Sequence, residues 1–241
     1  MLYTHRTPDK NTVNEDCAAL IRYNTTSGVL VISDGLGGQP NGETASKTAI
    51  EAISDSITKA SSENISLREA ILDGIEKANQ RIIKHSAGAA TTLAAIEIQG
   101  GQVRPFHVGD SMILICGQRG KIKLQSIAHS PVGYAVESGL LDEDEAIHHE
   151  ERHLISNVVG ADDMSIEIGS QRKLDKHDTV LVASDGLFDN LYLSEITELI
   201  RKGDLKHAAT QLVDLAHHRM SEKVTDLPCH PDDLTFILFR P

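Results

Sequence analysis

The chain has 241 residues, 40% of them hydrophobic and 24% charged, which is the size and composition of a single globular domain. Its formal net charge of −12 argues against a surface for nucleic acid or an anionic membrane, because such surfaces are normally basic. The three cysteines are far apart and odd in number, and no apolar run is long enough for a signal peptide or a membrane span. We therefore expect a reduced, cytoplasmic protein.

The first part of the chain predicts a hairpin followed by two long helices. Short, partly β-branched apolar segments at 17–23 and 29–33 are separated by a turn-prone stretch, as in a strand hairpin. Apolar residues then recur at three- and four-residue spacing over 42–60 and 66–86, the pattern of amphipathic helices.

Three further strands and a polar segment follow. The strands are expected at 91–98, 102–108 and 112–116, and their short glycine-containing connections predict a meander. Residues 128–155 are polar and rich in histidine and acid, with one short helix expected near 142–149. This segment is predicted to lie outside the core.

The last third mixes strands with paired helices. Strands are expected at 164–168 and 179–184, helices at 194–202 and 205–221, and a final strand at 234–239. Runs of neighbouring strands interrupted by paired helices, without steady alternation, favour an α+β fold with largely antiparallel sheets.

Aspartates recur where predicted strands meet turns. Asp34 and Asp185 each follow an apolar strand and precede a glycine, and Asp110 stands in a Gly-Asp-Ser turn after another strand. Asp232 and Asp233 come just before the last strand. One Asp-Gly pair alone is an ordinary turn signal. Several together, with oxygen donors and no cysteine, indicate a site for two cations, Mg²⁺ or Mn²⁺, that activates water.

Six motifs, in order from Asn14 to Phe239, resemble those of the PPM (type 2C) family of metal-dependent serine/threonine protein phosphatases, in its bacterial form. Each motif is weak alone, and the ordered set is specific. The motifs are Asn14-Glu15-Asp16, Asp34-Gly35-Leu36-Gly37-Gly38, Ala89-Ala90-Thr91-Thr92-Leu93, Gly109-Asp110-Ser111, Ala183-Ser184-Asp185-Gly186-Leu187-Phe188-Asp189 and Asp232-Asp233-Leu234-Thr235.

The resemblance implies a four-layer αββα sandwich, in which two mainly antiparallel sheets pack face to face between helices. Residues 1–241 would form one phosphatase domain with a small flap at about 128–160. The implied reaction is hydrolysis of phosphoserine and phosphothreonine on proteins, by direct attack of a hydroxide that bridges two metals. Phosphorylated proteins are then the substrates, and an opposing serine/threonine kinase in the same signal-transduction system is the expected partner.

The resemblance also assigns metal ligands. Asp34 is implied to bridge two cations, Asp185 and Asp232 to complete the first, and the Gly35 carbonyl to serve the second.

Further residues are implied to act around these ligands. Asp16, with Glu15, would hold metal-bound water, and Asp110 would help Asp185 to bind a weaker third cation.

Three positions depart from the family pattern. Asn11 stands where many relatives have an arginine that grips phosphate, so Lys10 or Arg6 is the expected substitute, although lysine lacks the bidentate fork of arginine. Leu36 stands where eukaryotic relatives have a histidine proposed as general acid. Asp233 replaces the usual asparagine, so either it or the aspartate before it could be the ligand.

Two alternative functions remain at this stage. Residues 149–153 spell H-E-x-x-H, which on a helix would present two histidines to zinc beside a glutamate base and would indicate a metalloprotease. The extended form of that motif is not present, and a solvated polar helix is the simpler interpretation. The second alternative is a phosphatase-fold binding or sensor module that hydrolyses weakly because the phosphate arginine is missing.

Overall fold

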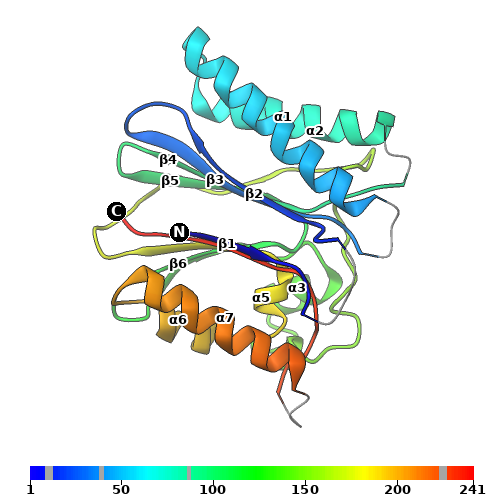
Figure 1. The fold of residues 1–241 in the computed structure, drawn as a ribbon, viewed down its shortest axis with the longest axis vertical. Helices are drawn as coiled ribbons and strands as arrows, with labels where there is room; N and C mark the ends of the chain where they lie inside the picture. Colours follow the sequence, from blue (N-terminus) through cyan, green and yellow to red (C-terminus); the bar gives the residue numbers. More distant parts are fainter. Residues whose placement is uncertain (9–12, 38–40, 86–87, 223–226) are drawn as a thin grey trace.

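Two antiparallel β-sheets pack face to face, and helices cover the outer face of each sheet (Figure 1). This is the four-layer αββα sandwich implied by the resemblance. The computed structural model describes residues 1–8, 13–37, 41–85, 88–222 and 227–241.

The first sheet has the strand order β2-β3-β4-β5-β8, with β9 also paired to β5. Its strands are β2 (Asp16–Arg22), β3 (Ser27–Asp34), β4 (Leu93–Gln99), β5 (Gln102–Val108), β8 (Glu167–Ile168) and β9 (Arg172–Lys173). Along β3, Val29 and Val31 pack toward helices, whereas Leu30 and Ile32 pack toward the second sheet. A slip of one residue would exchange these two faces, so burial on both sides fixes the register.

The second sheet has the order β1-β11-β10-β6-β7. Its strands are β1 (Leu2–His5), β11 (Leu234–Phe239), β10 (Thr179–Ala183), β6 (Met112–Cys116) and β7 (Ile122–Gln125). Strand β1, which was not predicted, pairs with β11 so that Leu2 lies opposite Ile237. This pairing places the start of the chain beside the segment that holds Asp232 and Asp233.

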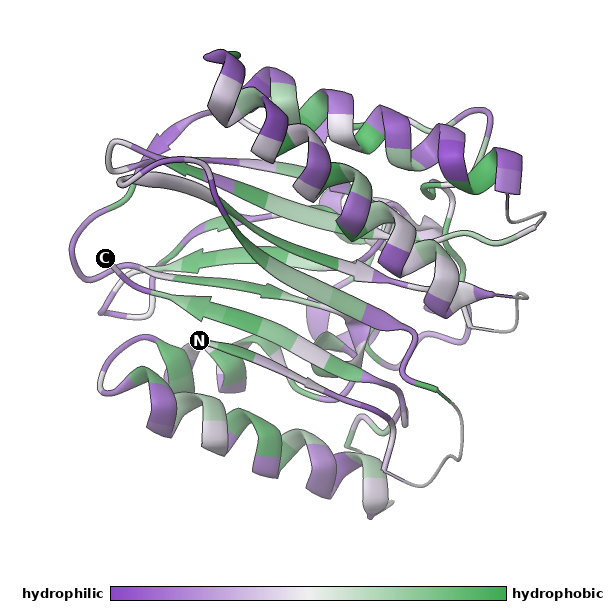
Figure 2. Cartoon of the chain, turned by 45° about the horizontal axis from the view of Figure 1, so that its top comes forward, coloured by the Kyte–Doolittle hydropathy of each residue, from purple (hydrophilic) through white to green (hydrophobic). Residues whose placement is uncertain are grey.

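Helices form the two outer layers, and their apolar faces turn toward the sheets (Figure 2). The first layer packs on β3, β4 and β5, and the second on β6, β10 and β11. The helices are α1 (Gly42–Glu63) and α2 (Leu67–His85) in the first layer, and α5 (Asp185–Phe188), α6 (Leu193–Ile200) and α7 (Leu205–Ser221) in the second. Among the helices of the described residues, none combines the length and apolar character needed to cross a membrane.

Residues 128–160, called the flap segment below, leave the second sheet after β7. They contain α3 (Pro131–Glu137), which was not predicted, and α4 (Glu143–Ala146), which is shorter than the helix expected at 142–149. Ser130 caps α3 by accepting a hydrogen bond from the Gly133 amide at 2.9 Å.

Most predicted elements are confirmed within a few residues. The hairpin is β2 and β3, the two long helices are α1 and α2, and the last two helices are α6 and α7. The strand expected at 164–168 shrinks to the two residues of β8. Only the end of the expected strand, Glu167 and Ile168, pairs with β5.

The predicted meander through 112–116 is wrong. β4 and β5 form a hairpin in the first sheet, whereas β6 pairs with β10 and β7 in the second. Gly109 begins the crossing with a φ of 101°, a conformation that favours glycine, and a Cβ there would lie 2.8 Å from the Thr92 side chain. Because the chain changes sheets here, Asp110 is placed between them.

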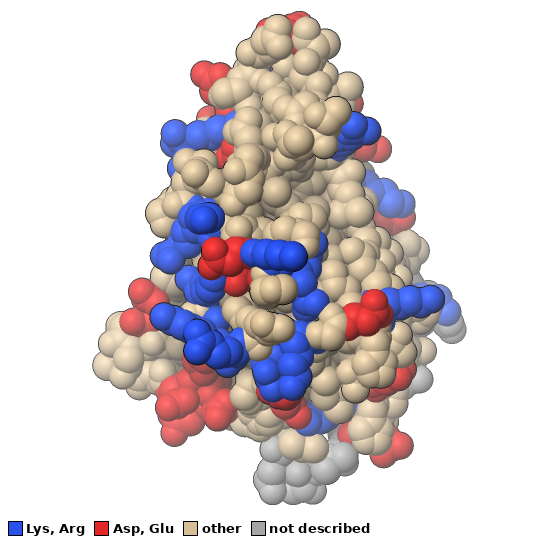
Figure 3. Space-filling model, turned by 90° about the vertical axis from the view of Figure 1, so that its left-hand side faces the viewer, with Lys and Arg blue, Asp and Glu red and all other residues tan. Residues whose placement is uncertain are grey.

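Lysine and arginine side chains gather over the end of the sandwich shown in Figure 3, although the sequence spreads them widely. Those that line a hollow by β7 and β9 are Lys121, Lys123, Arg172 and Lys173. Lys123 lies 2.7 Å from Asp175 and 2.8 Å from Asp178. Arg172 donates to the Lys123 carbonyl at 3.2 Å, so part of this basic charge serves to join the edges of the two sheets.

Candidate metal centre

Four aspartates meet at one end of the sandwich, where strands of both sheets end. Asp34 is the last residue of β3 and Asp16 the first of β2, and the strand register places them directly opposite each other. Asp185 begins α5 immediately after β10, and Asp110 lies between β5 and β6. The Ser184 hydroxyl donates to Asp16 Oδ2 at 2.9 Å, so a hydrogen bond joins the two sheets at this point.

These carboxylates raise one another's pKa. Burial, followed by the charges of Asp16, Asp185, Asp110 and Asp232, holds the pKa of Asp34 well above its usual value. The pKa of Asp185 is raised in the same way, by burial first and by neighbouring carboxylates second. Like charges placed together in a largely buried site destabilise the fold unless a cation neutralises them.

Asp16 and Asp110 each keep one buried oxygen without a partner. Burial is the main cause that raises both pKa values to about 7, and the charges of Asp233 and Asp189 respectively add to it. The Oδ1 atoms of Asp16 and Asp110 accept no hydrogen bond from the described residues. Buried polar atoms are normally satisfied, so these oxygens mark a place for a ligand. A donor set of carboxylates without sulfur fits Mg²⁺ or Mn²⁺.

The loop after β3 brings Gly35 and Glu15 next to this cluster. The Gly35 amide donates to the Glu15 carbonyl at 3.1 Å. A Cβ on Gly35 would collide with the main chain of Gly42, the first residue of α1. Only glycine therefore lets the loop pass this close to the helix, which explains the Asp-Gly pair at Asp34.

Asp232 and Asp233 have different surroundings. Asp233 is buried, and its oxygens accept hydrogen bonds from the Thr7 amide at 2.7 Å, the Thr7 hydroxyl at 3.0 Å and the Glu15 amide at 2.7 Å. Asp232 is exposed, and its charge contributes to the raised pKa of Asp34. Both charges reach the acidic cluster, but the oxygens of Asp233 are occupied in holding the N-terminal segment.

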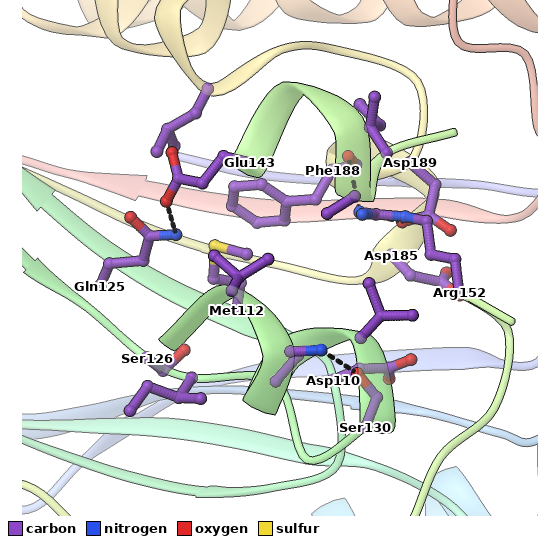
Figure 4. A pocket seen from close by; sticks show the side chains of 18 of the residues that line it. Asp110, Met112, Gln125, Ser126, Ser130, Glu143, Arg152, Asp185, Phe188 and Asp189 are labelled. Carbon is purple, nitrogen blue, oxygen red and sulfur yellow. Dashed lines mark hydrogen bonds and ion pairs between the residues drawn. The ribbon is translucent and has the colours of Figure 1, made fainter. Parts of the chain in front are cut away.

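Arg152 of the flap segment lies beside the acidic cluster (Figure 4). Its Nε donates to Asp189 Oδ1 at 2.5 Å and its Nη2 to the Phe188 carbonyl at 3.0 Å. Among the described residues that line the cavity here, Arg152 is the only lysine or arginine. No role was predicted for Arg152 or Asp189 from the sequence. The spacing of four residues from Asp185 could have indicated Asp189, since helical residues four apart share a face.

The expected phosphate-binding substitutes are not brought into this cavity. Lys10 and Asn11 lie outside the described residues. Arg6 is exposed and is not among the residues that line the cavity.

The H-E-x-x-H segment does not form the helix that a zinc site of this type needs. Helix α4 ends at Ala146, and residues 149–153 are turns and irregular chain. His149 Nδ1 instead accepts the Glu151 amide at 3.1 Å. The structure therefore does not support the zinc-protease alternative.

A second polar cluster ties the base of the flap segment to the Gly-Asp-Ser turn. The rings of His107 and His129 stack with centroids 4.3 Å apart, and His129 Nε2 lies 3.2 Å from Glu167 Oε2. His107 Nε2 bonds to the Ile127 carbonyl at 2.8 Å, and His129 Nδ1 accepts the Gly109 amide at 3.1 Å. Because a carbonyl only accepts, His107 Nε2 carries a proton. These ring nitrogens are engaged with the chain, so the cluster fits a structural role better than a metal site.

The raised pKa values predict how pH acts on the metal-free protein. Since the folded state binds protons at Asp16 and Asp110 with pKa values of about 7, their stabilising contribution is present at low pH and is lost as pH rises through about 7. Replacing Asp110 by asparagine should therefore raise the melting temperature relative to wild type, and by more at pH 8 than at pH 5, in thermal melts with chelator.

Comparing Asp110→Asn with wild type at each pH separates the contribution of Asp110 from that of His107, which both proteins share. Burial lowers the pKa of His107 below its ordinary 6.5, so that residue destabilises the protein as pH falls. An equal shift in melting temperature at both pH values would contradict the raised pKa of Asp110.

Known proteins match both the sequence and the fold. The family model described as protein phosphatase 2C matches residues 5–223. A putative protein phosphatase 2C-type protein of Streptococcus pyogenes is 28% identical over 199 residues, which are 79% of this chain and 80% of that protein. The serine/threonine phosphatase stp of Listeria monocytogenes is 24% identical over 198 residues, 78% of this chain and 77% of that protein.

Solved structures share the whole fold. The serine/threonine phosphatase of S. agalactiae has a TM-score of 0.82 at 26% identity, over 100% of this chain and 98% of that one. Stp1 of Staphylococcus aureus has a TM-score of 0.84 at 27% identity, over 100% of this chain and 94% of that one. The catalytic domain of PstP, solved in complex with two manganese ions, has a TM-score of 0.74 at 23% identity, over 99% and 95%. With a family model that spans most of its length, the chain belongs to the protein phosphatase 2C family.

Proposed function

We propose that this chain removes phosphate from phosphoserine and phosphothreonine of proteins, with the help of two divalent cations, Mg²⁺ or Mn²⁺. The observation that carries the proposal is the group of mutually repelling aspartates, two of which keep a buried oxygen without a partner among the described residues. Family membership supplies the reaction class. When bound, the cations would activate a water molecule and offset charge on the phosphoryl oxygens.

The proposed ligands surround Asp34. Asp34 would bridge the two cations, because it lies between carboxylates of both sheets, whose charges raise its pKa. Asp185 and Asp232 would hold the first cation, and the Gly35 carbonyl the second. Asp232 is preferred to its neighbour because Asp233 already accepts three hydrogen bonds.

Three acidic residues would act further out. Asp16, held through Oδ2 by Ser184, would orient water with its free Oδ1, and Glu15 would lie beside it. Asp110, with Asp185, would bind a weaker third cation through its own buried oxygen.

Arg152 is proposed to supply the phosphate contact that Asn11 lacks. Its contacts with Asp189 and Phe188 engage Nε and Nη2, which leaves the donors of Nη1 for a phosphoryl group near Asp185. A guanidinium can grip phosphate with two parallel hydrogen bonds, whereas lysine offers a point charge.

The wider setting is also part of the proposal. Residues 1–241 would act as one phosphatase domain, with residues 128–160 as its flap. An opposing serine/threonine kinase is the proposed partner, and neither nucleic acid nor a membrane surface is proposed. The free thiols of Cys17, Cys116 and Cys229 support a cytoplasmic location.

The direct test is hydrolysis of p-nitrophenyl phosphate and a phosphothreonine peptide with Mn²⁺. Asp34→Asn and Asp185→Asn should each lower kcat/KM by more than about a hundredfold, beyond the usual effect of a residue that only supports a ligand. Asp55→Asn, an exposed change on α1, is the control.

Metal-dependent turnover retained in both site variants would sink the proposal. Tight metal-dependent capture of the phosphopeptide by wild type, without release of phosphate, would instead favour the binding-module alternative.

Substitutions of Asp232 and Asp233 should have different effects on metal binding and on stability. Asp232→Asn should weaken Mn²⁺ binding and should not lower the metal-free melting temperature, because it removes one of the repelling charges. Asp233→Ala should cost about 2–4 kcal/mol of unfolding free energy, because it leaves buried donors of Thr7 and Glu15 without an acceptor. Calorimetric metal titration and denaturant unfolding measure the two effects, and a reversed pattern would identify Asp233 as the ligand.

Arg152 should matter for binding more than for fold. Arg152→Ala should raise KM for p-nitrophenyl phosphate and weaken inhibition by inorganic phosphate, each by about tenfold, the size expected for one charge-assisted hydrogen bond. Arg152→Lys should recover only part of this loss. If phosphate inhibits Arg152→Ala as strongly as wild type, Arg152 does not contact the phosphoryl group.

A further inference from the structure

A cavity of about 310 Å³ lies between the flap segment and the second sheet, and it reaches the acidic cluster (Figure 4). Asp110, Asp185 and Arg152 line its inner part. Residues of β6, β7, α3, α4 and α5, with the chain that follows β7 and α5, line the rest. One continuous space therefore joins the proposed metal site to the flap segment.

The walls away from the acidic cluster are largely apolar. Three parts of the chain supply them: the flap segment, β6, and the chain from α5 onward. Apolar residues that line the space include Val132, Val136, Ile147, Met112, Phe188 and Leu191. An apolar space of this size, left without protein atoms, forfeits packing contacts that a filled core would have. Such a space beside a reaction site is the usual form of a ligand pocket.

We propose that this cavity binds a large apolar side chain, such as leucine or phenylalanine, of the phosphoprotein substrate, from a residue close in sequence to the phosphorylated one. The proposal rests on the proposed phosphatase function and names the substrate class that this site prefers.

The size of the cavity selects this occupant. Its volume is at the lower end of the roughly 300–1,000 Å³ of small-molecule pockets, so it admits a side chain and excludes a helix or a second copy of the chain. A peptide whose phosphoryl group lies at Asp185 has its neighbouring side chains within reach of the same space. Burial of an apolar substrate side chain against these walls would then increase the affinity for the peptide.

Arg152 and the outer rim sharpen the preference. Asp189 and the Phe188 carbonyl hold Arg152 in place, so its guanidinium stays at the inner part of the cavity. Glu137 and Glu143 line the outer part, where Gln125 donates to Glu143 at 3.0 Å. An acidic substrate side chain would meet like charge there, whereas an apolar side chain avoids that cost.

The experiment uses phosphothreonine peptides in an alanine background, with leucine, phenylalanine, alanine or aspartate placed at one of the two positions on either side of the phosphothreonine. At one position or more, leucine or phenylalanine should raise kcat/KM about tenfold or more over alanine, and aspartate should lower it. The effect should appear mainly in KM, since the side chain binds away from the reacting atoms.

Two variants locate the effect. Val136→Asp, at a half-buried wall position, should abolish the preference for leucine over alanine. Leu140→Asp makes the same kind of change in the same flap segment at a residue that is 84% exposed and does not line the cavity, and it should keep the preference. Rates for each variant are divided by its own rate on p-nitrophenyl phosphate, and circular dichroism checks its fold.

Selectivity below about twofold at all positions, with p-nitrophenyl phosphate hydrolysed normally, would overturn this inference and leave the phosphatase proposal standing. Equal loss of preference in Val136→Asp and Leu140→Asp would also overturn it. If wild type does not hydrolyse p-nitrophenyl phosphate, the phosphatase proposal fails. The peptides are then compared by fluorescence anisotropy, where a leucine peptide that binds no tighter than its alanine counterpart overturns the cavity proposal as well.

Discussion

Repulsion among aspartates at one end of the sandwich is the constraint on which the rest of this structure depends. Asp16 and Asp34 are directly opposed across neighbouring strands, and Asp185 approaches them from the other sheet. The pKa of each is raised because burial and like charges oppose ionisation. Apolar packing in three layers, between the sheets and under each pair of long helices, provides the free energy that keeps these charges together.

Two sets of hydrogen bonds hold the ends of the two sheets together around this cluster. The Ser184 hydroxyl reaches across to Asp16, and Asp233 gathers the amides of Thr7 and Glu15. The second set explains why an aspartate replaces asparagine beside Asp232, since a carboxylate can accept from both segments at once. The N-terminal strand, which pairs with the last strand, brings these segments together.

Local patterns in the sequence were enough for much of this account. A short, partly β-branched apolar run marked β3, three- and four-residue spacing marked α1 and α2, and strands ending in aspartate marked Asp34 and Asp185. Long-range geometry was not encoded locally. The crossing at Gly109 looks like an ordinary hairpin turn, the choice between Asp232 and Asp233 depends on amides more than 200 residues away, and Arg152 reaches Asp189 through an irregular segment without periodicity.

The flap segment that carries Arg152 also forms one wall of an apolar cavity that reaches the acidic cluster. The proposed metal site and the proposed side-chain pocket are therefore continuous. The central claim is that this cluster holds two cations bridged by Asp34. Anomalous diffraction from crystals soaked in Mn²⁺ tests it most directly. Two strong peaks are expected, one on each side of the Asp34 carboxylate, with Asp185 and Asp232 beside one of them. Absence of peaks there, with a peak instead beside His107, His129 and Glu167, would contradict it.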